Sequence, residues 1–141
     1  MSTENNKALI RRVTEEAINR GNLALLDEVV GSDFVLHDPN YPQPVRGAEG
    51  LKQYFQTFRS AFPDLHFTIE DIIGEGDTVA VRQTGRGTHQ GELFGIPPTG
   101  KQLTVTAMIF HRFVNGKPVE NWVNSDSLGM LQQLGVIPAM S

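Results

Sequence analysis

Hydrophobic residues in the first half of the chain recur at the spacing of an α-helix. They fall three or four positions apart between residues 9 and 18, and Gly21 then ends that segment. The same spacing predicts a short helix over residues 23–30 and a longer one over residues 51–62. Residues 1–6 are polar, and we expect them to fray.

The second half of the chain changes to the alternation that is typical of β-strands. Asn115-Gly116 marks a tight hairpin turn, and Gly135 ends a final short helix that begins near Leu128. The predicted strands, including one from the first half, cover residues 34–38, 65–73, 78–88, 103–114 and 117–124. Helices followed by an antiparallel meander predict an α+β fold, in which a long curved sheet and the helices over one face enclose a concave pocket. We expect residues 1–141 to form a single domain.

The segment from Gly95 to Gln102 reads G-I-P-P-T-G-K-Q and has the spacing of a phosphate-binding loop. Such a loop holds phosphates with consecutive backbone N–H groups, and a Ser or Thr hydroxyl group after the lysine binds Mg²⁺. Pro97 and Pro98 lack N–H groups, Gln102 stands where the hydroxyl group is needed, and a strand pattern follows instead of a helix. The segment is therefore interpreted as a connection between two strands, and nucleotide binding is not expected.

Composition and charge narrow the range of partners. The chain has 141 residues, a net charge of −4 and no basic run, so we expect neither nucleic acid nor a membrane as a partner. The start of the chain is polar and no apolar run is long enough to cross a bilayer, which favours a cytoplasmic protein without a signal peptide. The absence of cysteine excludes disulfides and thiol catalysis.

Two stretches in the second half carry a family resemblance. They read FPDLHFTIEDIIGEGDTVAVRQTGRGTHQGELFGIPPTGK and NGKPVENWVNSDSLGMLQQLG. Both closely resemble the SnoaL-like family, which is related to the polyketide (ester) cyclases of anthracycline biosynthesis. The resemblance implies a cone-shaped α+β barrel of the nuclear transport factor two type. It also implies an apolar pocket inside the cone and a homodimer formed through the sheet.

The same resemblance implies a catalytic aspartate at the end of the last strand. A gapless alignment through NGK and QLG places it at Asp126, as general acid and base in an intramolecular aldol closure. Alternation puts Trp122, Asn124 and Asp126 on one face, where Trp122 could stack on a flat substrate and Asn124 could hydrogen-bond an oxygen. The alternative is that Asp126 caps the last helix, because Ser-Asp-Ser directly precedes that helix.

Two positions on the preceding strand depart from the pattern of the true cyclases. Those enzymes carry a Gln and a His two residues apart, and the same alignment places these positions on Ala107 and Ile109. The implied polar partners of Asp126 are therefore missing, and apolar contacts with a ligand are expected there instead. By alternation His111 lies on the same face, near the rim of the pocket. This departure favours a protein that binds a ligand without transforming it.

Four further positions are candidates for ligand contacts. His37 ends the first strand near the expected mouth of the pocket and is a second catalytic candidate, and alternation turns Asp38 to the opposite face. Tyr54 and Phe58 belong to an aromatic stripe that either packs the third helix on the sheet or also lines the pocket. In the pocket, Tyr54 would donate to a carbonyl oxygen. His89 is expected to form structural hydrogen bonds or to contact the ligand.

These features support one leading hypothesis. We expect the protein to bind a small hydrophobic carbonyl compound and to act as a cofactor-free acid/base catalyst of cyclase, isomerase or lyase type through Asp126. The alternatives are a non-catalytic binding module, an epoxide hydrolase-like enzyme that uses Arg82 and Asp126, and a dimerising structural domain. The sequence contains no metal-binding motif, so neither a metal nor a cofactor is expected.

Overall fold

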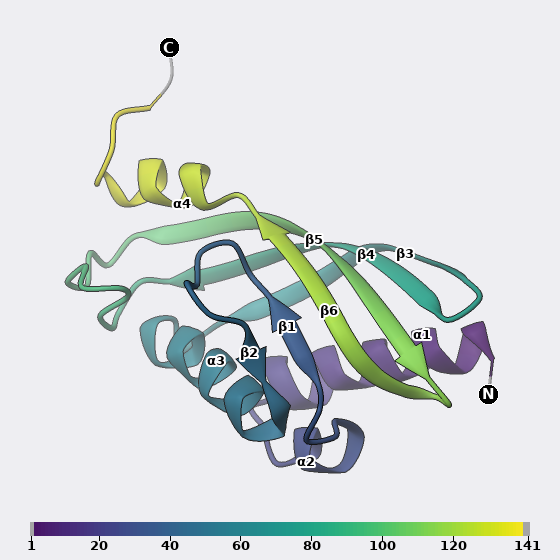
Figure 1. Ribbon diagram of the computed structural model, residues 1–141. Coiled ribbons are helices and arrows are strands. Elements are labelled where there is room, and N and C mark those ends of the chain that lie inside the picture. Colours follow the sequence, from purple (N-terminus) through teal and green to yellow (C-terminus); the bar gives the residue numbers. More distant parts are fainter. Residues whose placement is uncertain (1, 140–141) are drawn as a thin grey trace.

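A six-stranded sheet forms the frame of the computed structural model, which describes residues 2–139 (Figure 1). Its strand order is β2-β1-β6-β5-β4-β3. The strands are β1 (Val35–His37), β2 (Val45–Arg46), β3 (His66–Glu75), β4 (Thr78–Thr88), β5 (Gln102–Val114) and β6 (Lys117–Ser125). Neighbouring strands are antiparallel, as predicted, except that β1 runs parallel to β6. The sheet is curved but does not close into a barrel, and β2 was not predicted.

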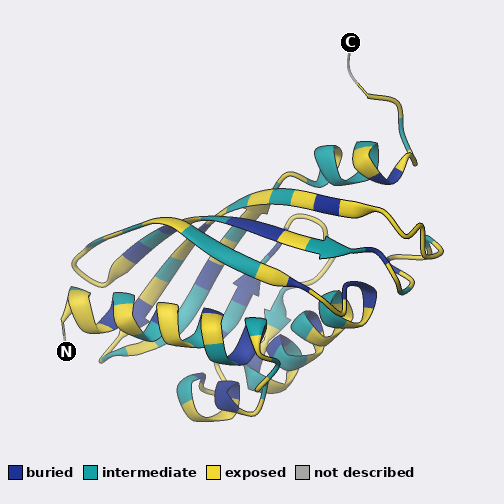
Figure 2. Ribbon diagram, turned by 180° about the vertical axis from the view of Figure 1, so that it is seen from behind, coloured by how far each residue is buried: buried dark blue, intermediate teal, exposed yellow. Residues whose placement is uncertain are grey.

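Helices from the first half of the chain cover one face of this sheet, as predicted (Figures 1 and 2). These helices are α1 (Thr3–Arg12), the π-helix η1 (Val13–Asn19), α2 (Leu25–Val29) and α3 (Gly47–Ala61). A further helix, α4 (Ser127–Leu134), lies in the second half of the chain. The backbone passes directly from α1 into η1 without leaving helical dihedral angles. Helix α4 follows β6 and lies beyond the end of that strand. The α+β prediction is therefore confirmed.

The start of α1 corrects one expectation. The helix begins at Thr3, and the Ser2 side chain caps it by accepting a 3.1 Å hydrogen bond from the backbone N–H of Asn5. Asn6 is buried. Ser2 therefore supplies the cap and residues 3–6 form the first helical turn in place of the expected frayed start, while Met1 lies outside the described residues.

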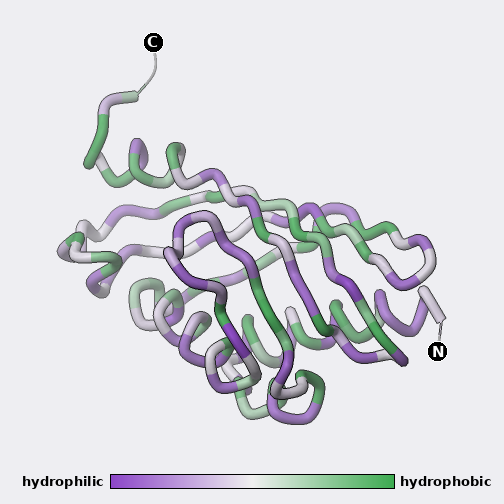
Figure 3. The backbone as a smooth tube through the Cα atoms, viewed as in Figure 1, coloured by the Kyte–Doolittle hydropathy of each residue, from purple (hydrophilic) through white to green (hydrophobic). Residues whose placement is uncertain are grey.

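The hydrophobic core fills the space between the helices and the sheet. Its buried side chains come from both layers, and Figure 2 shows buried positions on helices and strands alike. Figure 3 shows hydrophobic and hydrophilic residues interleaved along these elements, which is the pattern that the sequence displays. The largest fully buried side chains are Phe34, Phe113, Leu26, Leu93, His89 and Val79.

A β-bulge in β6 changes the register of the β5–β6 hairpin. Next to the turn, Phe113 lies opposite Pro118, but the following pair is Arg112 with Glu120. Val119 is therefore an extra residue in β6 without a partner in β5. Because successive side chains of a strand point to opposite faces, one extra residue reverses the face of every later residue.

The Gly- and Pro-rich segment connects β4 to β5, so the prediction of a strand connection is confirmed. Backbone hydrogen bonds close its base, from the N–H of His89 to the oxygen of Lys101 and from the N–H of Gly100 to the oxygen of His89, both 2.8 Å long. Within residues 2–139, no helix combines the length and the apolar character that a bilayer crossing requires.

Candidate functional site

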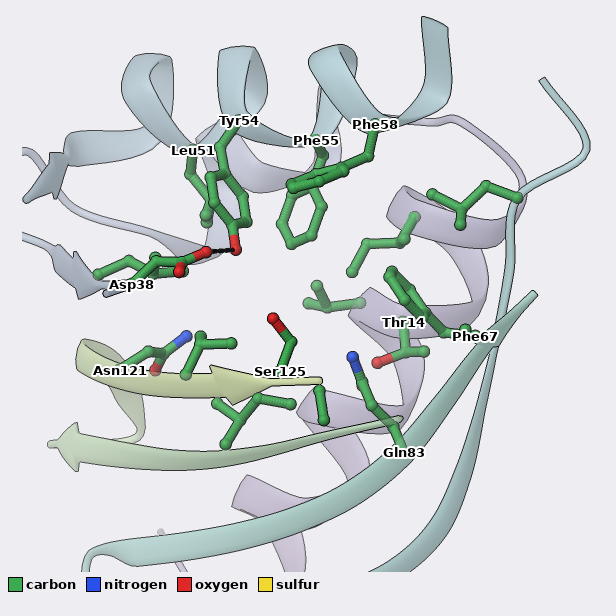
Figure 4. A pocket seen from close by; sticks show the side chains of 18 of the residues that line it. Thr14, Asp38, Leu51, Tyr54, Phe55, Phe58, Phe67, Gln83, Asn121 and Ser125 are labelled. Carbon is green, nitrogen blue, oxygen red and sulfur yellow. Dashed lines mark hydrogen bonds between the residues drawn. The ribbon is translucent and has the colours of Figure 1, made fainter. Parts of the chain in front are cut away.

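A cavity of about 190 Å³ lies between the sheet and the covering helices (Figure 4). An apolar cavity of roughly 150 Å³ holds one benzene ring, so this volume accommodates a compact ligand of one or two rings. Most of the lining is apolar. The apolar residues include Val13, Ile18, Leu36, Leu51, Phe55, Phe58, Phe94, Leu103, Val105, Ala107, Ile109 and Val123.

A buried carboxylate–phenol pair is the strongest polar feature of the cavity. Asp38 directly follows β1 and Tyr54 lies on α3, and both side chains are only 8% exposed. The Tyr54 hydroxyl group donates a 2.7 Å hydrogen bond to Oδ2 of Asp38, while the backbone N–H of Asn40 donates to Oδ1 at 2.9 Å. Burial, and then the charge of Asp38, raise the pKa of Tyr54 far above its ordinary value, so the phenol stays protonated.

Polar side chains from the sheet face this pair across the cavity. Figure 4 shows Asn121 and Ser125 on β6 and Gln83 on β4 with their polar ends directed toward the interior. His111 on β5 also belongs to the lining and pairs across the strands with Asn121. Desolvation lowers the pKa of His111 to about 4, an effect that the Asn121 side chain partly counters, so the imidazole is neutral near pH 7.

Four predicted residues do line the cavity. Phe58, Ala107 and Ile109 contribute apolar surface, and Tyr54 contributes its ring and its hydroxyl group. The Tyr54 hydroxyl group is engaged with Asp38, although it was predicted to donate to a substrate carbonyl. His111 lies on the cavity face with Ala107 and Ile109, as alternation along β5 predicts.

Three predicted residues on and after β6 lie outside the cavity. Trp122, Asn124 and Asp126 do share one face, but they are exposed and belong to the outer side of the sheet. Their predicted place in the lining is therefore wrong. The cause is the bulge at Val119, since a regular hairpin from Asn115-Gly116 would have put Trp122 opposite Ile109 on the inner face.

Asp126 instead has the alternative role that the sequence suggested. Its Oδ1 accepts a 2.9 Å hydrogen bond from the backbone N–H of Gly129, so the side chain caps α4. The cavity lining contains its neighbours Ser125 and Ser127. The carboxylate of Asp126 thus stabilises the start of a helix beside the cavity.

His37 lies on the outer face, and Asp38 on the inner face, as alternation predicts. Nε2 of His37 lies 2.7 Å from Oε2 of Glu120, and its ring stacks on Trp122 with centroids 5.7 Å apart. Arg112 contacts the other oxygen of Glu120 at 3.0 Å. The hydrogen bonds from His37 and from Arg112 lower the pKa of Glu120. The expectation that His37 approaches the pocket is therefore wrong.

His89 holds the β4–β5 connection and does not line the cavity. Its ring is fully buried beside Phe62, and Nδ1 accepts a 3.2 Å hydrogen bond from the backbone N–H of Thr99. Among the described residues, Nε2 has no hydrogen-bond partner. The structural interpretation of His89 is confirmed, and its predicted contact with a ligand in the cavity is not observed.

The residues suggested for epoxide hydrolysis do not meet. Nε of Arg82 pairs with Oδ2 of Asp71 at 2.6 Å on an exposed part of the sheet, whereas the carboxylate of Asp126 accepts from the backbone N–H of Gly129. Both partners of this ion pair are outside the cavity lining. Within residues 2–139, no three side chains of His, Cys, Asp or Glu come together in a way that would bind a metal.

Sequence reasoning missed Asp38, Asn121 and Ser125 as lining residues. Pro118 was the available signal, because proline inside a strand is typical of an edge or a bulge. A bulge there would have directed Asn121 and Ser125, rather than Trp122 and Asn124, to the side of Ala107 and Ile109. Asp38 is part of the site because it accepts a hydrogen bond from Tyr54, and no local sequence pattern indicates that contact.

The curved sheet, its covering helices and the largely apolar cavity define a pocket protein, because concave and mostly apolar cavities are the usual form of small-molecule sites. The family model of the SnoaL-like polyketide cyclases matches residues 8–134. The chain therefore belongs to the SnoaL-like polyketide cyclase family, as the sequence motifs predicted.

Proteins from several Streptomyces strains and species are similar to this chain over most of its length. The aklanonic acid methyl ester cyclase DauD of Streptomyces sp. (strain C5) is 30% identical over 135 residues, which cover 90% of this chain and 80% of DauD. The crystal structure of IdmH, a candidate polyketide cyclase from Streptomyces antibioticus, matches with a TM-score of 0.79 and 38% identity over 92% of this chain and 98% of IdmH. AclR from Streptomyces galilaeus, a candidate hydroxylase, matches with a TM-score of 0.86 and 32% identity over 99% of this chain and 87% of AclR.

Proposed function

We propose that this protein is a cofactor-free acid/base catalyst of the cyclase type that acts on a small hydrophobic carbonyl compound, with Asp38 as the base. The observation that carries the proposal is the position of Asp38, which is the single carboxylate among the described lining residues. Asp126, the residue that the resemblance implies, caps a helix on the outside. A general base must reach the proton that it removes, so the geometry favours Asp38.

The proposed reaction requires one proton to leave and return. A carboxylate oxygen of Asp38 takes the proton from the carbon next to a carbonyl group, and the electrons of the broken C–H bond form an enolate. The enolate carbon then attacks a second carbonyl of the same molecule, which closes a ring and leaves an alkoxide. Protonated Asp38 returns its proton to that alkoxide, so no cofactor is consumed.

The surroundings of Asp38 suit this role. Hydrogen bonds from Tyr54 and from the backbone of Asn40 orient the carboxylate, and the apolar lining excludes water from the reacting atoms. The name of DauD, an ester cyclase, supports cyclase-type chemistry here at 30% identity. The cavity volume indicates that one or two rings of the ligand are enclosed, and any larger part would extend outside.

The exchange of α-protons in 1-tetralone tests the proposal without the natural substrate. This bicyclic ketone has the one or two rings that the cavity of about 190 Å³ encloses, and proton NMR in D₂O follows the replacement of hydrogen by deuterium next to its carbonyl group. We expect the protein to accelerate exchange and Asp38→Asn to abolish the acceleration. The matched variant Asp126→Asn keeps a good helix cap and should exchange at the normal rate.

The two variants separate the candidate bases. Loss of exchange in Asp126→Asn with full exchange in Asp38→Asn would overturn the assignment of Asp38. Thermal unfolding of each variant shows whether a loss reflects unfolding instead of lost chemistry.

A non-catalytic binding module is the second candidate, and the apolar lining at Ala107 and Ile109 favours it. The true cyclases that the sequence resembles carry a Gln and a His at these positions. A binding module would bind 1-tetralone without accelerating its exchange. Titration of the protein with the ketone, followed by protein NMR, distinguishes binding from catalysis.

We also propose that the protein forms a homodimer through the outer face of the sheet. Met108 and Phe110 on β5 are 63% and 55% exposed, and Trp122 on the adjacent β6 is 39% exposed. Exposed apolar side chains that cluster on one face are typical of a protein interface.

A further inference from the structure

We infer that the side-chain amide of Asn121 binds the carbonyl oxygen of the substrate, and that His111 is the residue that positions this amide. The inference rests on the proposed function, because it assigns the group that stabilises the enolate formed when Asp38 removes a proton. It concerns two residues on neighbouring strands that the cyclase resemblance does not assign.

Asn121 lies beside Asp38 on the inner face of the sheet. In the parallel pair of β1 with β6, Asn121 is directly opposite Leu36, and Asp38 is two residues beyond Leu36. Leu36 and Asp38 therefore point to the same face, and both are buried, as is Asn121. A ligand whose acidic carbon meets Asp38 consequently has its carbonyl group within the neighbourhood of Asn121.

The orientation of the Asn121 amide supports a donor role. Figure 4 shows its nitrogen on the cavity side, toward Asp38, and its oxygen on the side of the strands. That Oδ1 atom is buried and therefore not exposed to the cavity, and it has no hydrogen-bond partner among the described residues. The amide N–H₂ group is the part of Asn121 that a bound molecule contacts.

His111 lies directly opposite Asn121 in the antiparallel pair of β5 with β6. The two side chains are close enough for Asn121 to counter part of the fall in the pKa of His111, although Oδ1 of Asn121 has no hydrogen-bond partner among the described residues. Burial keeps the pKa of His111 low, so the ring is neutral and carries one N–H group near pH 7. In the proposed arrangement this N–H donates to Oδ1, which would hold the amide nitrogen toward the cavity.

The proposed arrangement stabilises charge where the reaction creates it. When Asp38 takes the α-proton, the electrons of the C–H bond form a carbon–carbon double bond, and the carbonyl π electrons move to oxygen. An N–H group of Asn121 then donates to an oxygen that carries negative charge, and this hydrogen bond is stronger than the one to the neutral carbonyl. A neutral His111 beside it adds no competing charge.

The test uses 1-tetralone labelled with ¹³C at its carbonyl carbon. A hydrogen bond to the oxygen shifts the carbonyl ¹³C signal of the bound ketone downfield, and α-proton exchange is measured in the same samples. We expect Asn121→Leu and the isosteric Asn121→Asp to remove the downfield shift and to slow exchange about 100-fold. The matched control is Asn124→Asp, which makes the same change on the outer face of β6 and should leave both signals unchanged.

His111 is tested by a conservative and a non-conservative variant. His111→Gln retains an N–H donor and should keep most of the shift and the exchange rate. His111→Phe keeps an aromatic ring without a donor, and we expect it to lose part of the shift and roughly tenfold in exchange rate without weakening the binding of the ketone. A purely structural role of His111 would not distinguish these two variants in the carbonyl signal.

The outcomes separate this inference from the proposed function. Unchanged shift and exchange in both folded Asn121 variants, or loss of the shift in Ser125→Ala instead, would overturn the role of Asn121 while leaving Asp38 as the base. Absence of exchange in the wild-type protein would overturn the proposed catalysis, and the carbonyl shift would then still decide whether Asn121 binds the oxygen. A bound ketone without any downfield shift in the wild-type protein would refute the inference directly.

Discussion

The hydroxyl group of Tyr54 on α3 donates a 2.7 Å hydrogen bond to the carboxylate of Asp38 at the end of β1, and both side chains are buried. This contact links α3 to the end of β1 beside the cavity. It also gives a buried carboxylate one of the two hydrogen bonds that compensate for its removal from water. The same pair thus contributes to the stability of the fold and to the orientation of the proposed base.

Replacing Tyr54 by Phe should therefore destabilise the protein. The ring is retained, but Asp38 loses a donor while it remains buried, which we expect to lower the free energy of unfolding by about 1–3 kcal/mol. Urea denaturation near pH 7 measures this change. Tyr41→Phe is the matched control, because Tyr41 packs beside Tyr54 at a centroid distance of 5.3 Å and its hydroxyl group forms no hydrogen bond within the described residues. Equal losses in both variants would contradict the importance of the Tyr54–Asp38 bond.

The capping role of Asp126 predicts a different pattern for its variants. Asp126→Ala removes the acceptor for the backbone N–H of Gly129 and should lower the free energy of unfolding by about 1 kcal/mol, whereas Asp126→Asn should have little effect. Urea denaturation of the two variants provides the comparison. A stable Asp126→Asn protein that no longer catalyses exchange would instead favour the catalytic role that the family resemblance implies.

Desolvation of the His111 imidazole in the cavity wall should make the stability of the protein depend on pH. The folded-state pKa is about 4 and the ordinary value is 6.5, so the unfolded chain binds more protons between these two values. The free energy of unfolding therefore decreases as the pH falls through this window, by about 2 kcal/mol between pH 7 and pH 5 from this residue alone. We expect His111→Gln to lose this part of the pH dependence when urea denaturation is repeated at both pH values. An identical pH dependence in the wild-type protein and the variant would contradict the prediction.

A charge on the outer face of the sheet should disrupt the proposed homodimer. Phe110→Glu places a carboxylate among Met108 and Trp122, where a dimer would have to remove it from water. We expect sedimentation equilibrium to give a dimer for the wild-type protein and a monomer for this variant, with α-proton exchange retained in the monomer. Leu128→Glu changes an equally exposed apolar residue on α4 and should remain dimeric. A monomeric wild-type protein would refute the proposal.

Local patterns in the sequence were sufficient to predict most elements. Strand β4 matches its predicted range, and the helices α3 and α4 follow the predicted apolar stripes, because the periods of 3.6 and 2 residues are properties of short segments. The positions of Phe58 and Ala107 in the lining also follow from these periods. The two residues of β2 escaped prediction, since a strand this short has no alternation to detect.

Motifs in the sequence also determined the family and the turn at Asn115-Gly116, but the tertiary structure decided which face of β6 meets the cavity. The extra residue Val119 shifts the pairing by one position, so Asn121 rather than Trp122 faces inward. Asp38 and Tyr54 are sixteen residues apart in the chain, and their pairing likewise depends on how α3 packs on β1. The hydrophobic period is a property of the local sequence of each segment. Strand register and long-range contacts are decided only when the segments pack together.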